Sequence, residues 1–400
     1  MRRTIVVFLL LGLVSLFADI AYEGARSILG SYLRVLEAIA IIAGAVSIGD
    51  FIGYVMRLVS GAIASKIRSS RILWYFTIGG YIINLLAVPA LALTKHWNQV
   101  LALVILERSG KGIRTPARDV ILAEVSESMG RGKGFGIHEA MDQIGAIAGP
   151  AIVAFILGTT NNYSLSFIIL GIPAVIAIIL IVTASLLYPR IRSIEELSRE
   201  KGVRLGIVKE LKTVFWLYIA SISILSIGFL HWSLIAFYLK DQSIVSDTFI
   251  PILYLIAMAV DAIVAIPIGW LYDRVGFKSL FTAPLIAIPI PLLLFSKEYL
   301  AILISVVLWG AVIGIYETIM RATVADIVSP TTRPLAYGVM GFMYGISWMI
   351  GSIILGYLYD LSISLVVIFA VVASALSLIP LALAYREIKS LRSTYIHYIS

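Results

Sequence analysis

The sequence has no cysteine and little charge. Of its 400 residues, only 14% are Asp, Glu, Lys or Arg, whereas 60% are hydrophobic and the mean hydropathy is +1.00. The absence of cysteine excludes disulfide bonds and thiol chemistry. Average soluble proteins carry roughly 25% charged residues. A chain this apolar cannot bury its surface in one soluble core, so it must use lipid as part of its solvent.

The apolar segments favour membrane-spanning helices over a β-barrel. A backbone inside a bilayer must satisfy its own hydrogen bonds, which only helices and closed barrels achieve. Barrel strands are alternating segments of about 10 residues, but the apolar runs here are longer, rich in Leu, Ile and Ala, and do not alternate. The first run, from Thr4 to Leu29, is also longer than the apolar part of a signal peptide, which has about 7–15 residues.

The sequence predicts an all-α polytopic membrane protein with about twelve spans, because about 20 residues of helix cross the hydrocarbon layer. The expected spans are 4–29, 39–64, 72–93, 98–123, 134–158, 164–188, 214–239, 249–272, 279–296, 299–325, 334–358 and 363–385. One long polar stretch separates the two sets of six. We therefore expect an N-terminal six-helix bundle at 1–188, a cytoplasmic linker at 189–212, and a C-terminal six-helix bundle with a short cytoplasmic tail at 213–400.

The distribution of basic residues predicts that both termini are cytoplasmic. With the N-terminus inside, the inner segments hold twenty Lys and Arg residues and the outer loops hold four, and positive charge collects on the cytoplasmic side of membrane proteins. The same pattern explains the net charge of +8 without a nucleic-acid partner. We expect a monomeric, multi-pass protein of the cell membrane that needs no cofactor.

The two halves of the chain also share a pattern, which indicates an internal repeat. Matching residues occur 202 positions apart, and internal repeats are a common way to build transporters with a site at the membrane midplane. The matches are Ala123-Glu124-Val125 with Ala325-Asp326-Ile327, Phe135-Gly136 with Tyr337-Gly338, and Gly149 with Gly351.

Charged residues avoid every third predicted span. The spans at 72–93, 164–188, 279–296 and 363–385 contain no Asp, Glu, Lys, Arg or His, and the span at 334–358 has none either. Charge inside a bilayer is costly, so it marks positions that face protein or water. We therefore expect every third helix to face lipid and the others to surround a polar cavity.

Ionisable residues within the spans are the candidates for proton coupling and substrate binding. On the first span, Asp19, Glu23 and Arg26 are spaced by four and three, which puts them on one helix face. A buried carboxyl group can bind and release protons near neutral pH, so Asp19 and Glu23 are candidate proton carriers. The alternative is a structural ion pair with Arg26 or with the fourth span. The full set of candidates is Asp19, Glu23, Asp50, Arg108, Lys111, His138, Glu139, Asp142 and Asp261.

The fourth and fifth spans contribute most of this set. Arg108 and Lys111 are expected to bind an anionic group or to control a nearby acid, or else to form a fixed bridge to the first or fifth span. His138, Glu139 and Asp142 suit a proton relay, a structural pairing or a divalent metal, because imidazole and carboxylates are ordinary metal ligands. Nothing in their spacing fixes a coordination geometry, so no metal site is predicted.

Three further features have a structural and a functional interpretation. His231 is interpreted as a hydrogen-bonded residue within a helix. Glu317 and Arg321, four apart, are expected to form a cytoplasmic gate or a packing pair. Four aromatic residues are expected either to line an apolar ligand site or simply to pack, namely Tyr22, Tyr316, Tyr344 and Trp348.

The loop after the eighth span contains Gly269, Asp273, Arg274, Gly276 and Lys278. This set of residues resembles a signature of the major facilitator superfamily. In that family an acid, a base and glycines latch neighbouring helices on the cytoplasmic side. The corresponding loop after the second span departs from the pattern, because Ser65 stands where the acid is expected. That loop retains Gly61, Lys66, Arg68 and Arg71.

Two further stretches carry the same resemblance, which extends over the whole chain. Arg108 followed by Gly112 is similar to the motif that the family associates with proton coupling. The fifth span is similar to the motif of drug/proton antiporters, although Val153 and Ala154 replace its trailing glycine pair. The resembling residues of the fifth span are Gly136, Gly145, Gly149 and Pro150. Gly145 and Gly149 would allow close helix contact, and Pro150 would kink the helix.

The stretches around Asp19 to Glu23 and Arg108 to Asp119 resemble a poorly characterised prokaryotic branch of this superfamily. The resemblance implies two pseudo-symmetric six-helix bundles that work by alternating access. The residues it assigns to gating or motif positions, together with the predicted pair on the tenth span, are Gly61, Lys66, Gly112, Gly145, Gly149, Pro150, Gly269, Asp273, Arg274, Gly276, Glu317 and Arg321.

The sequence thus predicts a secondary active transporter, with proton-coupled efflux of a small molecule as the first hypothesis. Small-molecule substrate and protons would then be its partners. A proton-coupled symporter or a facilitator for an organic anion or divalent metal is the main alternative. A non-transporting receptor or scaffold is the alternative from another class, and it would usually add a soluble domain. An enzyme is not expected, because the sequence contains no nucleotide-binding loop and no nucleophile motif.

Overall fold

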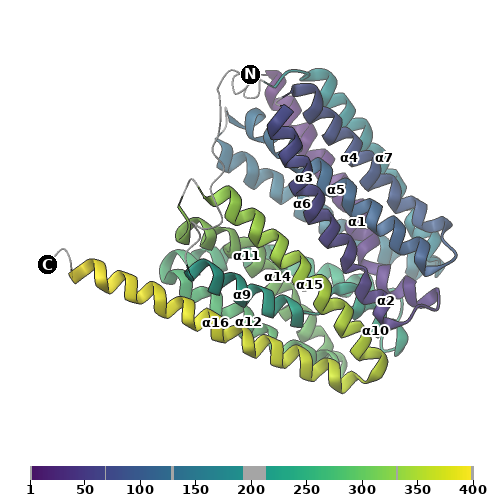
Figure 1. Ribbon diagram of the computed structural model, residues 1–400. Coiled ribbons are helices and arrows are strands. Elements are labelled where there is room, and N and C mark those ends of the chain that lie inside the picture. Colours follow the sequence, from purple (N-terminus) through teal and green to yellow (C-terminus); the bar gives the residue numbers. More distant parts are fainter. Residues whose placement is uncertain (1, 68, 128–129, 192–212, 330–331, 398–400) are drawn as a thin grey trace. The chain divides into compact units, whose positions relative to one another are not determined.

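The computed structural model describes residues 2–67, 69–127, 130–191, 213–329 and 332–397 (Figure 1). These residues form helices and no strand. The first part of the chain contains α1 (Arg2–Val35), α2 (Ala40–Ala45), α3 (Ser47–Ile67), α4 (Ser70–Ala90), η1 (Leu91–Leu93), α5 (Trp97–Val125), α6 (Arg131–Thr160) and α7 (Tyr163–Leu187). The second part contains α9 (Thr213–Gly228), α10 (Trp232–Asp241), α11 (Phe249–Val275), η4 (Gly276–Phe281), α12 (Thr282–Ala287), α13 (Pro289–Leu294), α14 (Tyr299–Ile327), α15 (Arg333–Leu361) and α16 (Ile363–His397).

The helices agree with twelve membrane spans. Among the described residues, ten helical stretches are long and apolar enough to cross a membrane. One of them, Phe249–Leu294, has 46 residues and covers two predicted spans. α5 is not among the ten, and it carries Glu107, Arg108, Lys111 and Arg114 within 18 residues of its start. Ten stretches, one more for the double stretch and one for α5 make twelve, so the predicted fold class is confirmed.

The internal repeat is visible in the helix boundaries. α5 begins at Trp97 and ends at Val125, and α14 begins at Tyr299 and ends at Ile327, which are both 202 residues later. α6 and α15 begin at Arg131 and Arg333 with the same offset. The two sets of helices therefore follow one pattern, as the sequence matches predict.

Three predicted spans are interrupted, although the sequence analysis treats each as one helix. The span at 39–64 is divided at Val46 into α2 and α3, and the span at 214–239 is divided at residues 229–231 into α9 and α10. The span at 279–296 consists of η4, α12 and α13. Three prolines explain the last case, because proline has no backbone N–H to donate. They are Pro284, Pro289 and Pro291.

The contacts within the described residues divide the chain into two compact units. The N-terminal unit contains α1 to α7, and it also includes Trp232–Leu255, which comprise α10 and the first residues of α11. The C-terminal unit contains α9, the rest of α11 and the helices from α12 to α16. The domain boundaries at 188 and 213 stay predictions, and most of the predicted linker, 192–212, lies outside the described residues.

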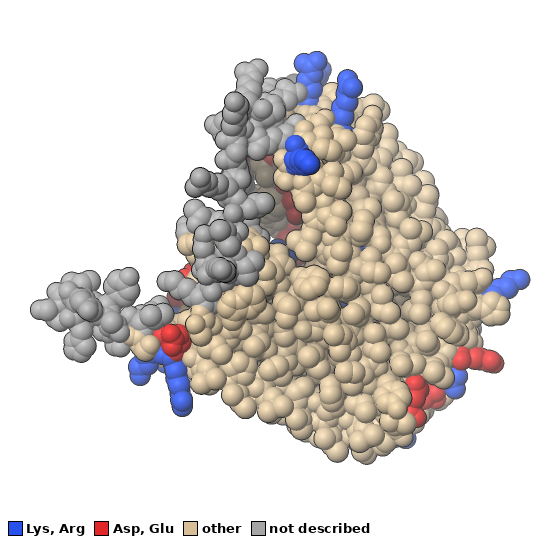
Figure 2. Space-filling view, viewed as in Figure 1, with Lys and Arg blue, Asp and Glu red and all other residues tan. Residues whose placement is uncertain are grey.

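α7 and the part of α16 that covers the charge-free span 363–385 present exposed apolar faces. On α16 the exposed residues recur every three or four positions, which is one face of a helix. They are Leu365, Ile368, Val372, Leu376, Ile379 and Leu383. Most of the surface visible in Figure 2 is likewise uncharged, with Lys, Arg, Asp and Glu gathered towards helix ends. These faces fit the prediction that charge-free helices contact lipid.

Close helix packing brings the candidate residues of the N-terminal unit together. α6 approaches α1 at Gly145, where an added Cβ would lie 2.8 Å from the Cβ of Asp19. α4 approaches α5 at Gly80, where an added Cβ would lie 2.7 Å from both the Cβ of Arg114 and the carbonyl oxygen of Gly110. Only glycine leaves room for these contacts, as expected for small residues at membrane helix interfaces.

Candidate functional site

Arg108 lies at the centre of a buried ion-pair cluster in the N-terminal unit. Its side chain is only 6% exposed, and its Nε lies 3.0 Å from Oδ1 of Asp50 on α3 and 3.2 Å from Oε2 of Glu107. The side-chain amide of Asn84 on α4 donates to Oε1 of Glu107 at 2.5 Å. One cation thus holds two carboxylates from two helices. The predicted bridge to the first or fifth span is wrong, because the partner helix is α3.

Small residues on α3 explain this pairing. An added Cβ on Gly49 would lie 3.2 Å from Cγ of Arg108, and one on Gly53 would lie 3.2 Å from the Arg108 carbonyl oxygen. An added Cβ on Gly112 would lie 2.8 Å from Cβ of Met56. The backbones of α3 and α5 therefore approach closely, and Asp50 can reach the guanidinium of Arg108. Residue spacing along α5 alone does not predict this partner.

Glu23 is held by two partners. Nη1 of Arg26 lies 3.5 Å from its Oε1, and the hydroxyl of Tyr254 donates a short hydrogen bond to its Oε2. Tyr254 belongs to the first residues of α11, which are part of the N-terminal unit. Tyr254 could not be predicted as this partner, since nothing in the sequence links a tyrosine to an acid 231 residues away.

Beside this pair, α1 and α5 bound a small cavity. It is lined by Tyr22, Arg26, Glu107 and Arg108 together with apolar residues, and its volume is about 20 Å³. That is room for about one water molecule. The cavity is therefore too small for an organic substrate.

Asp19 is buried between α1 and α6, and it is one of the candidates that the structure brings close to others. It interacts electrostatically with Asp142 on α6 and with Lys111 on α5. Nζ of Lys111 lies 3.9 Å from the centre of the Tyr22 ring, which is a cation–π contact. Two acids from neighbouring helices thus lie within electrostatic range of each other, and Lys111 lies within range of Asp19.

His138 and Asp142 are the second polar group on α6. Nε2 of His138 lies 3.1 Å from Oγ of Ser15 and 3.9 Å from Oδ1 of Asp142. Nη1 of Arg118 donates to the same serine hydroxyl at 3.4 Å. The chain of contacts runs from α5 through α1 to α6.

Glu139 does not join this group, so the predicted trio is not assembled. It is exposed, whereas His138 is buried. Successive residues of a helix point about 100° apart, so Glu139 leaves the face that His138 and Asp142 share. Within the described ranges there is no group of three His, Asp or Glu that could hold a metal ion, and the metal alternative gains no support.

The residues of the predicted latch lie at the end of α11. Gly276 has φ +59°, a left-handed conformation that favours glycine and ends the helix. Asp273 and Arg274 are exposed, and Cζ of Arg274 lies 3.4 Å from the centre of the Trp270 ring. An added Cβ on Gly269 would lie 3.6 Å from Thr318 of α14, an ordinary contact.

The other motif residues have less distinctive surroundings. Lys66 is exposed near the end of α3, and an added Cβ on Gly61 would lie 3.7 Å from Pro116. Glu317 and Arg321 are both exposed on α14. Their roles in gating stay predictions, as does that of Pro150 within α6.

The C-terminal unit contains one buried acid of the candidate set, Asp261. It is 4% exposed on α11. Its Oδ1 lies 3.0 Å from the position that a Cβ on Gly314 of α14 would occupy. A glycine at this point therefore makes room for the carboxyl group between two helices.

The break between α9 and α10 corrects the interpretation of His231, which lies in the break and not within a helix. Two indole groups satisfy the backbone there. Nε1 of Trp348 donates to the carbonyl oxygen of Phe229 at 3.0 Å, and Nε1 of Trp309 donates to that of Leu230 at 2.8 Å. Non-helical backbone at membrane depth needs such partners, so α14 and α15 stabilise the interruption.

We expect Trp348→Phe to lower the stability of the protein. Phenylalanine keeps the aromatic ring but leaves the Phe229 carbonyl without its donor, and a buried unpaired group costs about 1–3 kcal/mol. Thermal unfolding of the purified protein in detergent measures the change. Trp216→Phe is the matched control, because Trp216 is 41% exposed on α9. Equal unfolding temperatures for the two variants would contradict the role of the indole.

Aromatic rings surround the break within the C-terminal unit. The rings of Phe229 and Trp309 are stacked at 5.8 Å, and the ring of Tyr344 lies 5.6 Å from those of both Tyr316 and Trp348. The sequence leaves open whether the aromatic residues line a ligand site or pack. In the structure, the rings from α14, α15 and the break form one continuous cluster.

The repeat gives this cluster a counterpart in the N-terminal unit. At the offset of 202 residues, Trp309 corresponds to Glu107, Tyr316 to Arg114 and Tyr344 to Asp142. Charged side chains in one unit therefore correspond to aromatic side chains in the other. The two halves share a fold and have diverged in chemistry.

Comparison with known proteins finds relatives along nearly the whole chain. The family model described as Major Facilitator Superfamily matches residues 11–243 and 217–394. A protein of Mycobacterium tuberculosis described as uncharacterized is 36% identical over 383 residues, which cover 94% of this chain and 91% of the relative. An uncharacterized MFS-type transporter of Methanocaldococcus jannaschii is 31% identical over 384 residues, which cover 92% of each.

Solved structures share the fold at low identity. The nucleoside transporter NupG has a TM-score of 0.75 at 15% identity, with 96% of this chain and 99% of that chain covered. A mutant of the peptide transporter POT in complex with sulfate has a TM-score of 0.74 at 14% identity, with 95% and 94% covered. At such identities the likeness concerns the fold alone.

Proposed function

This chain belongs to the Major Facilitator Superfamily, and we propose that this membrane transporter exports a small molecule by proton-coupled alternating access. The observation that carries the proposal is that the buried Asp19 of α1 interacts with Asp142 of α6, which is 19% exposed, where the two helices pack closely at Gly145. Ionised carboxylates repel each other where water is scarce, and a bound proton removes that repulsion. Binding and release of a proton at this pair would change how α1 and α6 interact.

We assign the other charges of the N-terminal unit to supporting roles. Arg108 is fully engaged by Asp50 and Glu107, so it holds α3 to α5. Glu23 is already held by Arg26 and Tyr254, so we consider it a weaker candidate for the proton carrier than Asp19 and Asp142. Glu139 and the chain of His138, Ser15 and Arg118 would connect the acid pair to water.

The C-terminal unit would shape the substrate site. Its aromatic cluster around the break would supply apolar contacts to the substrate, because aromatic faces bind organic groups through large contact areas. Asp261 is the one buried acid of the candidate set in this unit. Proton coupling in one unit and substrate contacts in the other would fit the different side chains of the two repeats.

Transport driven by an imposed pH gradient tests the function. A thermal-shift screen of drugs, organic acids, sugars and metal ions first identifies a ligand, which is then loaded with the purified protein in liposomes. An exporter moves the ligand against the direction of proton flow. Ligand movement with the protons would indicate a symporter instead, and movement that ignores the pH gradient would indicate a facilitator and contradict proton coupling.

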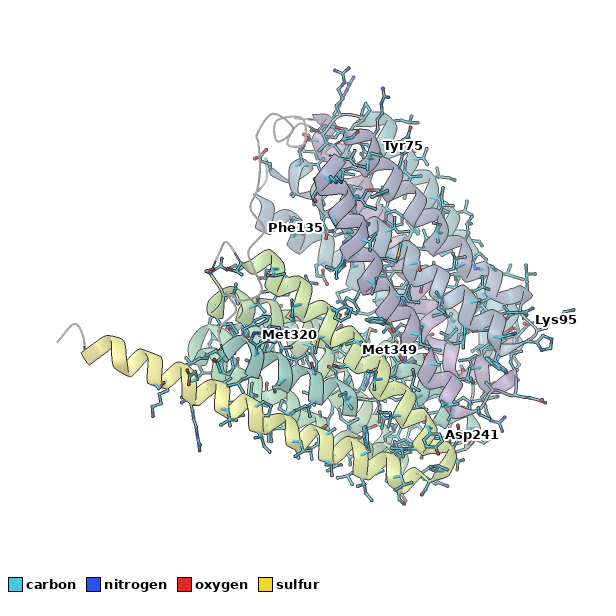
Figure 3. The ribbon with its side chains drawn as sticks, viewed as in Figure 1. Tyr75, Lys95, Phe135, Asp241, Met320 and Met349 are labelled. Carbon is cyan, nitrogen blue, oxygen red and sulfur yellow. The ribbon has the colours of Figure 1, made fainter. Side chains whose placement is uncertain are left out.

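We also propose that the protein is a monomer of the cell membrane with both termini in the cytoplasm. Within the N-terminal unit, Lys95 and Asp241 lie at one end of the helices, and Tyr75 lies towards the other (Figure 3). This arrangement agrees with Lys95 on the outer side and the loop before α4 on the inner side. Basic residues collect inside, and Arg71 lies in the first turn of α4, next to that loop.

The lack of native cysteine makes this orientation directly testable. A membrane-impermeant maleimide added to intact cells should label Lys95→Cys and leave Arg71→Cys unlabelled until the cells are permeabilised. Both native side chains are exposed, so access by the reagent is not limited by burial. The reverse pattern of labelling would overturn the orientation.

A further inference from the structure

Arg114 is a buried cation without a carboxylate partner. It is 2% exposed on α5, and within the described residues it forms no ion pair. Its Nε and Nη1 are buried and have no hydrogen-bond partner, and its Cζ lies 4.1 Å from the centre of the Tyr81 ring. Burying an unpaired charge costs free energy, and packing alone does not explain why an arginine occupies this position.

Lys111 is in a similar position one helical turn earlier. Its Nζ contacts the Tyr22 ring, and no described carboxylate lies within ion-pair distance of it. Residues three apart lie on the same helix face. The nearest acids are engaged or set further back. Glu23 is already held by Arg26 and Tyr254, and Asp19 interacts with Lys111 only at longer range.

The other basic residues of α5 show what a structural arginine looks like here. Arg108 is paired with Asp50 and Glu107. Nη2 of Arg118 lies 2.8 Å from Oδ1 of Asp119. Lys111 and Arg114 differ from both, because each contacts an aromatic ring and neither forms an ion pair within the described part of the chain, and two nitrogens of Arg114 have no hydrogen-bond partner there.

A second buried group without a hydrogen-bond partner lies beside Arg114. The hydroxyl of Tyr81 is buried and has no hydrogen-bond partner within the described protein. Buried polar groups are almost always satisfied, and an exception calls for an absent partner. The guanidinium of Arg114, the ammonium of Lys111 and the phenol of Tyr81 can all donate hydrogen bonds, so one acceptor would satisfy all three. Because Arg114 and Lys111 are cations, we expect that acceptor to be an anion.

We propose that Lys111 and Arg114 form an oxyanion-binding site for a carboxylate or phosphate group of the transported molecule. A planar guanidinium binds both groups through two parallel hydrogen bonds, and Tyr81 and Tyr22 fix the two cations in place. This inference rests on the proposed transport function and deepens it by naming the substrate class. Arg114 is 11 residues from the end of α5, about 16 Å along the helix, which is too deep for a lipid headgroup.

Binding to the purified full-length protein tests the site. Isothermal titration and thermal shift are measured with inorganic phosphate, glycerol phosphate and succinate, and with glycerol and succinamide as uncharged analogues. We expect at least one oxyanion to bind, and its uncharged analogue not to bind. The phosphate and succinate arms decide between the two groups. Failure of every oxyanion to bind wild-type protein would overturn the proposal.

Substitutions then separate this site from general charge effects. Arg114→Leu and Lys111→Gln should weaken oxyanion binding roughly 10- to 100-fold, the loss expected for charged hydrogen bonds. Lys95→Gln removes one exposed positive charge and should leave binding unchanged. Unweakened binding by Arg114→Leu would contradict the assignment.

The stability of the same variant distinguishes a binding role from a structural one. Removing a charge that has no partner should leave the unfolding temperature of Arg114→Leu equal to or above that of the wild type. A marked fall would show that the guanidinium has a structural partner and would overturn the inference. If Arg114→Leu does not fold, Arg114→Lys keeps the charge without the paired geometry and should still bind the oxyanion about tenfold more weakly.

The proposal of proton coupling and the proposal of an oxyanion site can be tested separately. Asp19→Asn and Asp142→Asn leave Lys111 and Arg114 in place, so both variants should retain oxyanion binding. If they also retain proton-driven transport, the coupling assignment is wrong and the oxyanion site stands. If they lose binding as well, the oxyanion site is not independent of the acids and the inference falls.

Discussion

Arg108→Leu is expected to destabilise the protein by about 3–5 kcal/mol, the cost of breaking a buried ion pair by removing one partner. The leucine side chain fills most of the space, but Asp50 and Glu107 are left as buried carboxylates without their cation. The loss would act on the contact between α3 and α5. Thermal unfolding in detergent, with chemical denaturation as a second method, measures it.

An exposed ion pair provides the control. Nε of Arg34 lies 2.6 Å from Oδ1 of Asp241, but the Arg34 side chain is 40% exposed. Exposed pairs contribute about 0–1 kcal/mol, so Arg34→Leu should change stability little. A triple variant that also carries Asp50→Asn and Glu107→Gln should recover much of the loss. Equal stability of Arg108→Leu and Arg34→Leu would contradict the claim that Arg108 stabilises the contact between α3 and α5.

The second large effect concerns transport itself. Asp19→Asn and Asp142→Asn should each reduce proton-driven flux to the level of protein-free liposomes, because an amide has the shape of the carboxyl group but cannot carry its proton. Exchange of ligand in the absence of a pH gradient should persist, since alternating access without net proton movement remains open. Uptake and counterflow in liposomes measure the two properties separately.

Glu298→Gln is the matched control for these variants. It removes one acid of the same chain at an exposed position before α14, so proton-driven flux should be unchanged. Normal proton-driven flux in both Asp19→Asn and Asp142→Asn would remove the basis of the coupling assignment. Loss of both flux and exchange would indicate a folding defect, which the unfolding temperature detects.

The membrane spans and their repeat could be predicted from the sequence, because hydropathy and helix length depend on composition over a window. The break at residues 229–231 could not. No proline lies in it, and the groups that stabilise it come from Trp309 and Trp348, which are far along the chain. Such a break becomes favourable only when distant donors reach the backbone.

The sequence predicts many of the residues of the candidate site, but it does not predict which of them contact each other. Spacing assigns Glu107, Lys111 and Arg114 to one face of α5, but it does not say which helix packs against that face. The partner of Arg108 is set by glycines of α3, and that of Glu23 is Tyr254 of α11. The sequence places Arg114 on the same face as these residues, and only the packed structure shows that two of its nitrogens have no hydrogen-bond partner among the described residues.

Proton movement that accompanies substrate movement tests the central claim most directly. Liposomes containing the wild-type protein and a trapped pH-sensitive dye are given a substrate gradient and no pH gradient. The account predicts that substrate leaving through the protein drives protons in the opposite direction, and that Asp19→Asn with Asp142→Asn abolishes this signal. Substrate flux through the wild-type protein with no change of internal pH would contradict it.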